Sequence, residues 1–599
     1  MPAGRCDQVA ISSPLTTAVL PPDRGQVHIH VPLQPGDNEI KAECREHGVV
    51  QGAAQQNWHV RLRNVPTTWI RVSESSKGLI LDAQASAQAP IGGNAITSYE
   101  WQTRDSNPAL LAGLPASDPR IELPASAPDG EYIIRLKVTD AAGRSDEGAV
   151  MLRSQGGVLR AVDPVRDHSA WIDRAVVYGV VPALFGPRGL ADVTARLDQL
   201  SDLGITALWL APITESPPGD FGYAVTDYFG LRRSLGAGED LRALIRAAHA
   251  RGIRVIMDFV PNHLSDQHPY FTDTIGGAGG SPYFDFFARG QNGSAEHYFD
   301  WSNLKNLNYS NPEVQRLVIE AFAHWVREFD IDGFRVDVAW GPRQRAPDFW
   351  PRWRAELKRI KPDLLLLAEA SARDPYYGHN GFDAVYDWTD KLGEWAWHGA
   401  FEDEANTARR LRAAIEASAS DAQVLRFLEN NDTGARFRSR YGLGRTRVAA
   451  AMLLTLPGIP CLYTGQEIGA AYEPYKDPHQ IAWDDVDGLR GWYQRLIALR
   501  RDNPVLRSRD LRMRDVAPGE QVLVYVRPGE VPSDSILIML NYGPSRADVT
   551  IGADTIELMQ SREFVDLLTG NEIIPDGSRV SVAGHAVRIL KSKKDAAMQ

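Results

Sequence analysis

Cysteine is scarce in this chain of 599 residues, which contains only Cys6, Cys44 and Cys461. The three lie far apart and are odd in number, so the sequence predicts neither a metal-binding cysteine cluster nor a disulfide framework. Cys461 stands in an apolar run, and we expect it to be a small buried residue.

Long apolar runs and an excess of positive charge are also missing. No stretch approaches the ~18 apolar residues of a membrane span, and residues 1–21 lack the charged start and apolar core of a signal peptide. Acidic residues outnumber basic ones, 76 against 65, and the net charge of −11 is spread along the chain. This balance disfavours a nucleic acid or a membrane surface as a partner. The composition predicts a soluble protein and is equally compatible with a cytoplasmic, periplasmic or secreted location and with any oligomeric state.

The length predicts roughly three or four domains, because one hydrophobic core rarely organises so long a chain. Residues 1–65 are predicted to form a β-rich N-terminal region, in which Val27, Ile29, Val31 and Leu33 alternate with more polar residues.

Residues 66–165 carry strand candidates at 79–83, 96–101 and 130–140, separated by turn signals. Through Tyr99-Glu100-Trp101 and the run 136–140, this region resembles the polycystic-kidney-disease type of immunoglobulin-like β-sandwich. Such modules act as spacers or bind carbohydrates and partners. We favour a spacer here, because the region has no cluster of exposed aromatic residues.

Between residues 166 and 505, short β runs alternate with helical segments, which is typical of parallel βα units. The eight strand candidates are 176–182, 205–211, 254–259, 333–338, 364–369, 382–387, 423–428 and 458–463. Helices are expected at 190–203, 239–251, 312–329, 347–360, 404–418, 444–456 and 488–502. For the helix at 312–329, Asn311 can cap the first turn and Pro312 suits it. This order predicts a (β/α)8 TIM barrel, with its active site at the C-terminal ends of the strands.

Two further regions complete the predicted architecture. Residues 264–310, after the third strand, are too long for a plain loop and are predicted to form a small lobe over the active-site face. Residues 506–599 return to β runs, which predict a C-terminal antiparallel β-sandwich.

Charged residues stand where barrel strands should be apolar. Arg335 and Asp337 lie on one face of the fourth strand, and buried charges are costly unless they are paired or used. Taken alone, they could be a structural ion pair. However, Glu369 ends the fifth strand, Asp432 follows the seventh, and Asp258 lies near the end of the third. Three carboxylates from strands four, five and seven converge on one barrel mouth, which favours a catalytic role.

These motifs resemble the α-amylase family, glycoside hydrolase family thirteen, over residues 170–592. The resemblance rests on residues 258–263, 333–337, 369 and 427–432, which occur in family order on the expected strands. Gly222-Tyr223, Asp227-Tyr228 and the runs 304–308 and 458–467 support it.

The resemblance implies a retaining mechanism, which needs a nucleophilic carboxylate and a protonated carboxyl about 5 Å apart. It implies that Asp337 is the nucleophile, aligned and kept ionised by Arg335, and that Glu369 is the acid/base. Asp432 would hold the 2- and 3-hydroxyls of the distorted sugar.

Five further residues are predicted to bind substrate. By resemblance, Tyr223 would stack on the sugar ring and His263 would bond its 6-hydroxyl. Asn431 replaces a histidine common in the family and can donate one hydrogen bond. Asp220 is spaced from Tyr223 as in exo-acting α-glucosidases, where the acid holds the terminal sugar, with Arg436 as a candidate partner. A solvated loop position explains Asp220 equally well.

Another departure concerns calcium. Where many α-amylases have Lys-His after the nucleophile, this chain has Trp340-Gly341. This disfavours the usual calcium site, so we expect no metal and no organic cofactor, and Asn262 is open to a structural or a metal-binding role.

The sequence thus predicts a retaining α-glycoside hydrolase acting on α-glucosidic linkages of oligosaccharides. Two alternatives remain: a transglycosylase with the same catalytic residues, and a catalytically weakened carbohydrate-binding protein. The Asn431 replacement favours the last slightly, and the three intact carboxylates oppose it. Some aromatic residues of the lobe should form its own core, which is the favoured role for any given one, while one or two could stack on sugar rings.

Overall fold

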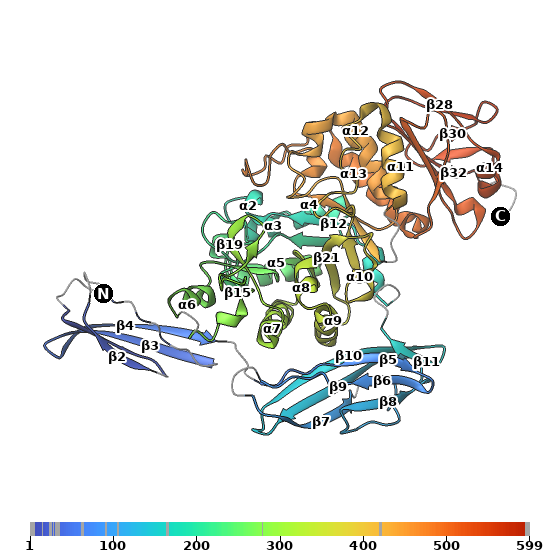
Figure 1. Cartoon of the computed structure of the whole chain (residues 1–599). Helices are drawn as coiled ribbons and strands as arrows, with labels where there is room; N and C mark the ends of the chain where they lie inside the picture. Colours follow the sequence, from blue (N-terminus) through green and yellow to red (C-terminus); the bar gives the residue numbers. More distant parts are fainter. Residues whose placement is uncertain are drawn as a thin grey trace.

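The computed structural model describes residues 6–14, 16–22, 27, 29, 31, 36–60, 65–89, 93–104, 107–162, 167–277, 280–417 and 422–593. Four regions follow one another along the chain (Figure 1). They are an N-terminal antiparallel sheet, a two-sheet β-sandwich, a central barrel with an inserted lobe, and a C-terminal β-sandwich.

The central region is a closed barrel of eight parallel strands, as the sequence predicted. Its strands are β12 (Val177–Val180), β13 (Ala207–Leu210), β16 (Arg254–Phe259), β20 (Gly333–Val336), β21 (Leu365–Ser371), β22 (Ala384–Tyr386), β23 (Gln423–Phe427) and β24 (Ile459–Tyr463). Each overlaps its predicted run. Cys461 is buried in the barrel interior, as expected.

Helices surround the barrel at the predicted places, and one further helix, at Trp340–Arg345, was not predicted. They are α3 (Leu190–Ala195), α4 (Leu197–Leu203), α5 (Gly238–His249), α7 (Pro312–Phe329), α8 (Trp340–Arg345), α9 (Phe349–Ile360), α11 (Thr407–Ala417), α12 (Phe437–Thr455) and α13 (Leu489–Asp502). The predicted helix 190–203 is divided at Arg196 into α3 and α4, and α12 begins seven residues earlier than expected, with a break at Gly442 (φ 79°).

Helix α7 shows how the sequence places the fourth strand. The Asn311 side chain accepts a hydrogen bond from the Glu313 amide (2.9 Å), and Pro312 occupies the first turn, as predicted. One apolar face, including Val318, Phe322 and Trp325, is buried in the barrel core. The helix ends at Asp330, whose φ of 60° turns the chain into β20. The register of β20 is thereby fixed by a well-capped, well-packed element.

The inserted lobe contains β17 (His263–Ser265), α6 (Pro269–Gly277), η2 (Phe284–Phe286), β18 (His297–Tyr298) and β19 (Trp301–Asn306). Tyr283, Phe286 and Phe287 form its buried core, as the sequence predicted for some of its aromatic residues. Phe299 and Trp301 remain exposed, at 58% and 61%.

The N-terminal region is a four-stranded sheet of β1 (Gln8–Ser12), β2 (Thr17–Leu20), β3 (Gly36–Glu46) and β4 (Val49–Val60). In Figure 1 it stands apart from the barrel. The predicted strand around Val27, Ile29 and Val31 is wrong, because these residues belong to no strand, and Leu33 lies outside the described residues.

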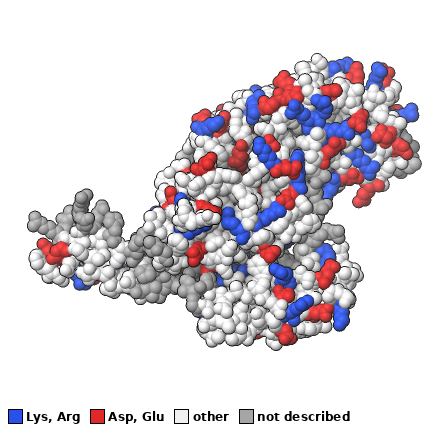
Figure 2. Space-filling model, in the orientation of Figure 1, with Lys and Arg blue, Asp and Glu red and all other residues white. Residues whose placement is uncertain are grey.

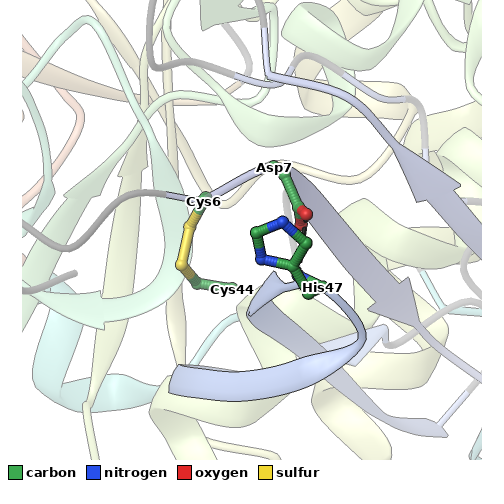
Figure 3. The surroundings of a disulfide bond; sticks show 4 residues. All are labelled: Cys6, Asp7, Cys44 and His47. Atoms are coloured by element: carbon green, nitrogen blue, oxygen red, sulfur yellow. Dashed lines mark hydrogen bonds between the residues drawn. A yellow bond between two sulfur atoms is a disulfide. The ribbon is translucent and has the colours of Figure 1, made fainter.

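A disulfide joins Cys6 to Cys44, which corrects the expectation that no disulfide forms (Figure 3). Antiparallel pairing of β1 with β3 brings the start of β1 to the end of β3. The Cα of Cys6, two residues before β1, lies 5.4 Å from that of Cys44, although the two cysteines are 38 positions apart in the sequence. Linear spacing could not reveal this pairing. The Asp7 side chain accepts a hydrogen bond from the amide of His47 (2.7 Å), at the tip of the β3–β4 hairpin.

The second region is a sandwich of two antiparallel sheets, in keeping with the immunoglobulin-like prediction. One sheet contains β5 (Arg71–Ser75), β6 (Gly78–Asp82) and β8 (Arg120–Pro124), and the other β7 (Ile96–Thr103), β9 (Gly130–Asp140), β10 (Ser145–Gln155) and β11 (Val158–Ala161). Leu81, Trp101 and Leu136 are fully buried between them. Strand β10 packs on α9 of the barrel (Figure 1).

The C-terminal region contains β25 (Arg512–Arg514), β26 (Val522–Arg527), β27 (Ile536–Asn541), β28 (Ala547–Thr550), β29 (Phe564–Asp566), β30 (Glu572–Ile573), β31 (Arg579–Val582), β32 (Val587–Ser592) and α14 (Ala553–Met559). A six-stranded and a two-stranded sheet enclose one apolar core, as predicted for a sandwich. Strands β26 and β27 pack on α11 and α12 of the barrel.

Positive and negative side chains are interspersed on the molecular face in Figure 2. Within the described part of the chain, every helix is too short or too polar to cross a membrane.

Candidate active site

Arg335 is the centre of the candidate site. It lies on β20 in register with Asp258 of β16, and both residues are fully buried. Its Nη1 donates to Asp258 Oδ1 (2.9 Å) and Asp337 Oδ1 (2.7 Å), and its Nη2 lies 2.6 Å from Glu369 Oε1. Its Nε donates to the Tyr386 hydroxyl (3.0 Å). One planar guanidinium therefore orients carboxylates from three neighbouring strands.

The turn after β20 connects two of these carboxylates. Val338, directly after Asp337, has a φ of 48°, which is rare for a β-branched residue. In this conformation its amide donates to Glu369 Oε2 (2.8 Å). A strained backbone held in place by its surroundings is typical of functional sites. Here the strain aims a backbone donor at Glu369 and fixes its position beside Asp337.

The charges of this cluster do not cancel. Burial alone would lower the pKa of Arg335, but the negative charges of Asp258 and Glu369 outweigh it and raise that pKa. Burial raises the pKa of Asp258 to about 6, although Arg335 acts in the opposite direction. Burial and the charge of Glu369 raise the pKa of Asp337 well above its usual range. Arg335 acts in the opposite direction on the pKa of Asp337, so its role in keeping Asp337 ionised stays a prediction.

Asp258 also anchors Tyr223, the residue predicted to stack on the sugar. The Tyr223 hydroxyl and the Trp209 indole nitrogen each donate to Asp258 Oδ2 (3.3 Å). Tyr223 is thus fixed by its polar end at the mouth of the barrel, a position that is compatible with stacking.

Asn431 and Asp432 follow β23 and form a second polar group at the mouth. The Asn431 Nδ2 lies within hydrogen-bonding distance of the hydroxyls of Tyr475 (2.6 Å) and Tyr223 (3.2 Å) and of Asp432 Oδ1 (3.1 Å). The Asn431 Oδ1 is buried and has no hydrogen-bond partner among the described residues. The amide donors that the sequence assigned to the sugar are therefore already used within the protein, and the oxygen is the group left to contact a ligand.

Asp432 lies at the open end of this group. The surrounding walls and the negative charge of Glu369 raise the pKa of Asp432 to about 7. The residue nevertheless remains exposed, so solvent in the mouth screens this effect. Asp432 also borders a cavity of about 330 Å³, whose other walls include Trp388, Trp395, His398 and Arg440.

His263 has both ring nitrogens engaged within the protein. Its Nδ1 lies 3.0 Å from Asn262 Nδ2, and its Nε2 lies 3.1 Å from the Tyr223 carbonyl oxygen. Burial lowers the pKa of His263 to about 3, so the ring is neutral and can accept at Nδ1 while donating at Nε2. The structure thus gives His263 the task of holding the Tyr223 backbone, and a bond to a sugar hydroxyl stays a prediction.

The structure does not unite Asp220 and Arg436, which the sequence paired at one end of the pocket. Asp220 Oδ1 accepts from the amides of Gly222 (2.6 Å) and Ala224 (3.0 Å), and so supports its own loop. Arg436 is buried, pairs with Glu429, and lies over the Tyr472 ring. Arg436, at the start of α12, is committed to Glu429 and contributes no contact to Asp220 among the described residues, so the structure lends the Asp220–Arg436 partnership no support.

The residues around Asn262 do not fit a calcium ion. The Asn262 Oδ1 accepts a hydrogen bond from Arg345 Nη2, so a guanidinium stands where a metal would bind this oxygen. A side chain at Gly341 would place its Cβ 1.9 Å from the same oxygen, which explains why glycine is found there. This chain thus supplies a permanent cation of its own, and the structural role for Asn262 is favoured.

Sequence reasoning missed several residues of the site. Tyr475 follows the eighth strand, Tyr386 ends β22, and Trp209 lies on β13. Trp209 and Tyr386 stand among apolar neighbours, and Tyr475 stands in the polar run 473–477, so no local signal marks any of the three as a site residue. Their roles arise only when the barrel closes.

Comparisons with known proteins agree with this geometry. The family model of the α-amylase catalytic domain matches residues 186–503. The chain is 32% identical over 435 residues to the α-amylase MalA of Haloarcula japonica, covering 69% of this chain and 62% of that protein. It is 28% identical over 439 residues to a cyclomaltodextrinase of Geobacillus thermopakistaniensis, covering 67% and 69%. The type III pullulan hydrolase of Thermococcus kodakarensis shares the fold, with a TM-score of 0.60, 22% identity, and coverage of 87% of this chain and 98% of that one.

Proposed function

The chain belongs to the α-amylase family, and from this premise we propose that it is a retaining glycoside hydrolase acting on α-glucosidic linkages of oligosaccharides. One observation carries the proposal: a single guanidinium holds Asp337 and Glu369 side by side, with Asp258 behind them. Retaining enzymes need two carboxyl groups at the short separation of about 5 Å, and the two arms of the Arg335 fork supply such a spacing.

In the first step, an oxygen of Asp337 attacks the anomeric carbon of the sugar. The bond from this carbon to the leaving oxygen breaks, and Glu369 transfers its proton to that oxygen. The product is a β-glycosyl ester on Asp337. Tyr223 and Asp432, at the same mouth, would hold the ring while positive charge develops on it.

In the second step, Glu369 takes a proton from water, and the water oxygen attacks the anomeric carbon. The ester bond breaks, Asp337 leaves as a carboxylate, and the sugar is released with its original α configuration. A sugar hydroxyl can replace water in this step, which gives transglycosylation with the same residues. The alternative of a pure binding protein is opposed by the intact carboxylate pair.

The proton shared by the cluster is part of this proposal. Catalysis requires it on Glu369 with Asp337 ionised, whereas burial at rest favours protonation of Asp337. Positive charge developing on the sugar next to Asp337 would stabilise its carboxylate and leave the proton to Glu369. The proposed mechanism thus requires one proton on the carboxylate pair.

The proposed substrate is longer than one sugar unit. The cavity beside Asp432 extends the mouth with indole rings and polar side chains, a lining that suits further glucosyl units. We also propose that no metal takes part, since Arg345 occupies the Asn262 oxygen.

Azide rescue of two variants tests the proposal. Wild type should cleave maltooligosaccharides, and NMR should detect the α-anomer first. Asp337→Gly with azide should yield a β-glycosyl azide, while Glu369→Ala with azide and an activated substrate should yield the α-glycosyl azide. Isomaltose, sucrose and trehalose would define the linkage. If wild type leaves every one of these sugars unchanged, or the first product is the β-anomer, the proposal fails.

A further inference from the structure

Three aromatic side chains cluster where the lobe meets the barrel mouth. Ring centroids lie 4.7 Å apart for Tyr298–Phe299, 5.6 Å for Phe299–Trp340 and 6.0 Å for Tyr298–Trp340. Tyr298 and Phe299 come from the β18–β19 hairpin, and Trp340 is the first residue of α8. Two segments about 40 residues apart thus build one aromatic surface.

Phenylalanine is unusual for the backbone conformation of residue 299. Phe299 begins the two-residue turn between Tyr298 and Trp301, with a φ of 46°, where Gly, Asn or Asp is usual. A left-handed conformation costs such a residue about 1–2 kcal/mol. Phe299 is 58% exposed, so more than half of its surface stays open to a ligand. The turn does not require phenylalanine, and the ring packs against Tyr298 and Trp340 while part of its surface faces the solvent, as a sugar-stacking residue would.

The surface also lies close to the carboxylates. Trp340 follows Val338 by two residues, and the Val338 amide is bonded to Glu369. The Tyr298 ring lies 5.2 Å from that of His263, and burial together with the charges of Glu369 and Asp337 raises the pKa of Tyr298.

The strand order shows on which side of the barrel mouth the aromatic surface lies. Trp340 follows β20, whereas Asn431 and Asp432 follow β23, three strands further around the closed barrel. Under the proposed function, Asp432 holds the sugar that becomes attached to Asp337. The aromatic surface therefore flanks Glu369 on the side where the leaving group departs.

We propose that Phe299 and Trp340 form a stacking platform for the sugar unit on the leaving-group side, which binds that unit through the apolar C–H face of its ring. This inference rests on the proposed function and adds the acceptor class. When a sugar occupies the platform after the first step, its hydroxyl oxygen attacks the anomeric carbon and its proton passes to Glu369. The ester to Asp337 breaks, and a new glycosidic bond forms in place of hydrolysis.

A binding experiment tests the platform without turnover. In a Glu369→Gln background, calorimetry with maltotriose should show at least about a tenfold loss of affinity in Phe299→Asn and in Trp340→Leu, the loss expected when a stacking contact disappears. The matched control is Trp301→Leu, which alters an equally exposed aromatic residue of the same hairpin and should stay within twofold.

Thermal unfolding separates binding from folding. Asn tolerates the left-handed region, so Phe299→Asn should keep or raise the melting temperature while it weakens binding. A purely structural Phe299 would give the reverse, a lower melting temperature with unchanged affinity. Equal affinity for maltotriose in the parent and both platform variants would overturn the inference.

A second experiment compares kcat/KM for two substrates that differ in their leaving group. In α-D-glucosyl fluoride the leaving group is one atom, too small to reach the platform. The platform variants should lose at least about ten times more kcat/KM on maltotriose than on the fluoride, and form less transfer product with added maltose. Equal losses on both substrates would count against the platform. If wild type cleaves neither compound, the proposed hydrolase fails, while calorimetry still decides the platform.

Discussion

Replacing Arg335 by methionine should destabilise the barrel in a way that depends strongly on pH. Arg335 is fully buried and forms ion pairs with Asp258, Asp337 and Glu369. Removing one partner of a buried pair costs about 3–5 kcal/mol, because the other charge is left uncompensated. In this variant the uncompensated groups are carboxylates. Protonation neutralises them and so reduces the loss of stability.

The free-energy cost of protonating these carboxylates depends on the pH. Protonating a carboxylate with an ordinary pKa near 3.9 costs about 1.4 kcal/mol per pH unit, hence about 5–6 kcal/mol at pH 8 and about 1.5 kcal/mol at pH 5. Loss of the cation raises the carboxylate pKa values in the folded state only. The stability that a raised pKa contributes is present at low pH and is lost as the pH rises through that pKa. We therefore expect a loss of about 3–5 kcal/mol at pH 8, and at least about 1.5 kcal/mol less at pH 5.

Urea unfolding followed by tryptophan fluorescence at pH 5 and pH 8 measures both values. The matched control is Arg500→Met, since Arg500 is also buried but donates to the carbonyl oxygens of Leu454, Leu456, Leu506 and Gly458. Its removal leaves neutral acceptors, so its effect should be equal at the two pH values. If Arg335→Met loses the same free energy at both, or less than about 1 kcal/mol at pH 8, the account of a shared cation is refuted.

Four other outcomes can be checked. Asn431→His should lower turnover of maltotriose, because Tyr475 already contacts the amide and leaves no room for an imidazole; higher turnover would show that the pocket still suits histidine. EDTA should leave the rate and melting temperature unchanged, whereas Arg345→Ala should lower the melting temperature by freeing the Asn262 oxygen; sensitivity to EDTA would contradict the metal-free proposal. Cys44→Ser opens a 38-residue loop, so the N-terminal sheet should lose about 3–4 kcal/mol, seen as faster proteolysis with equal turnover; unaltered proteolysis would argue against this. The pH profile of kcat/KM should be bell-shaped, since the carboxylate pair must hold one proton; a rate that only rises with pH would exclude the shared proton.

The role of Asn431 shows why a substitution in a motif is hard to interpret from sequence. The sequence gives an amide in place of an imidazole and predicts a donor to the sugar. In the structure, Tyr475 and Tyr223 surround the amide nitrogen, and Tyr475 belongs to a loop with no motif. The replacement is thus part of a rearranged hydrogen-bond network, and the free oxygen offers an acceptor instead.

Much of the barrel could be predicted because its signals are local. Apolar runs of strand length, the cap at Asn311 and the spacing of apolar residues in 312–329 each act within a few residues of the chain. The carboxylates at the ends of strands four, five and seven could be expected to meet, because a parallel barrel brings those ends to one mouth.

Tertiary structure alone decided the rest, because the contacts concerned join distant segments. Cys6 meets Cys44 only through the pairing of β1 with β3. Arg436 was a plausible ligand until the fold enclosed it beside Glu429. The sequence by itself thus determined which carboxylates gather at the mouth, since strand order and period fix their positions. Which of them hold protons, and which aromatic rings remain open to a sugar, depend on burial and on neighbours that only the folded chain brings together.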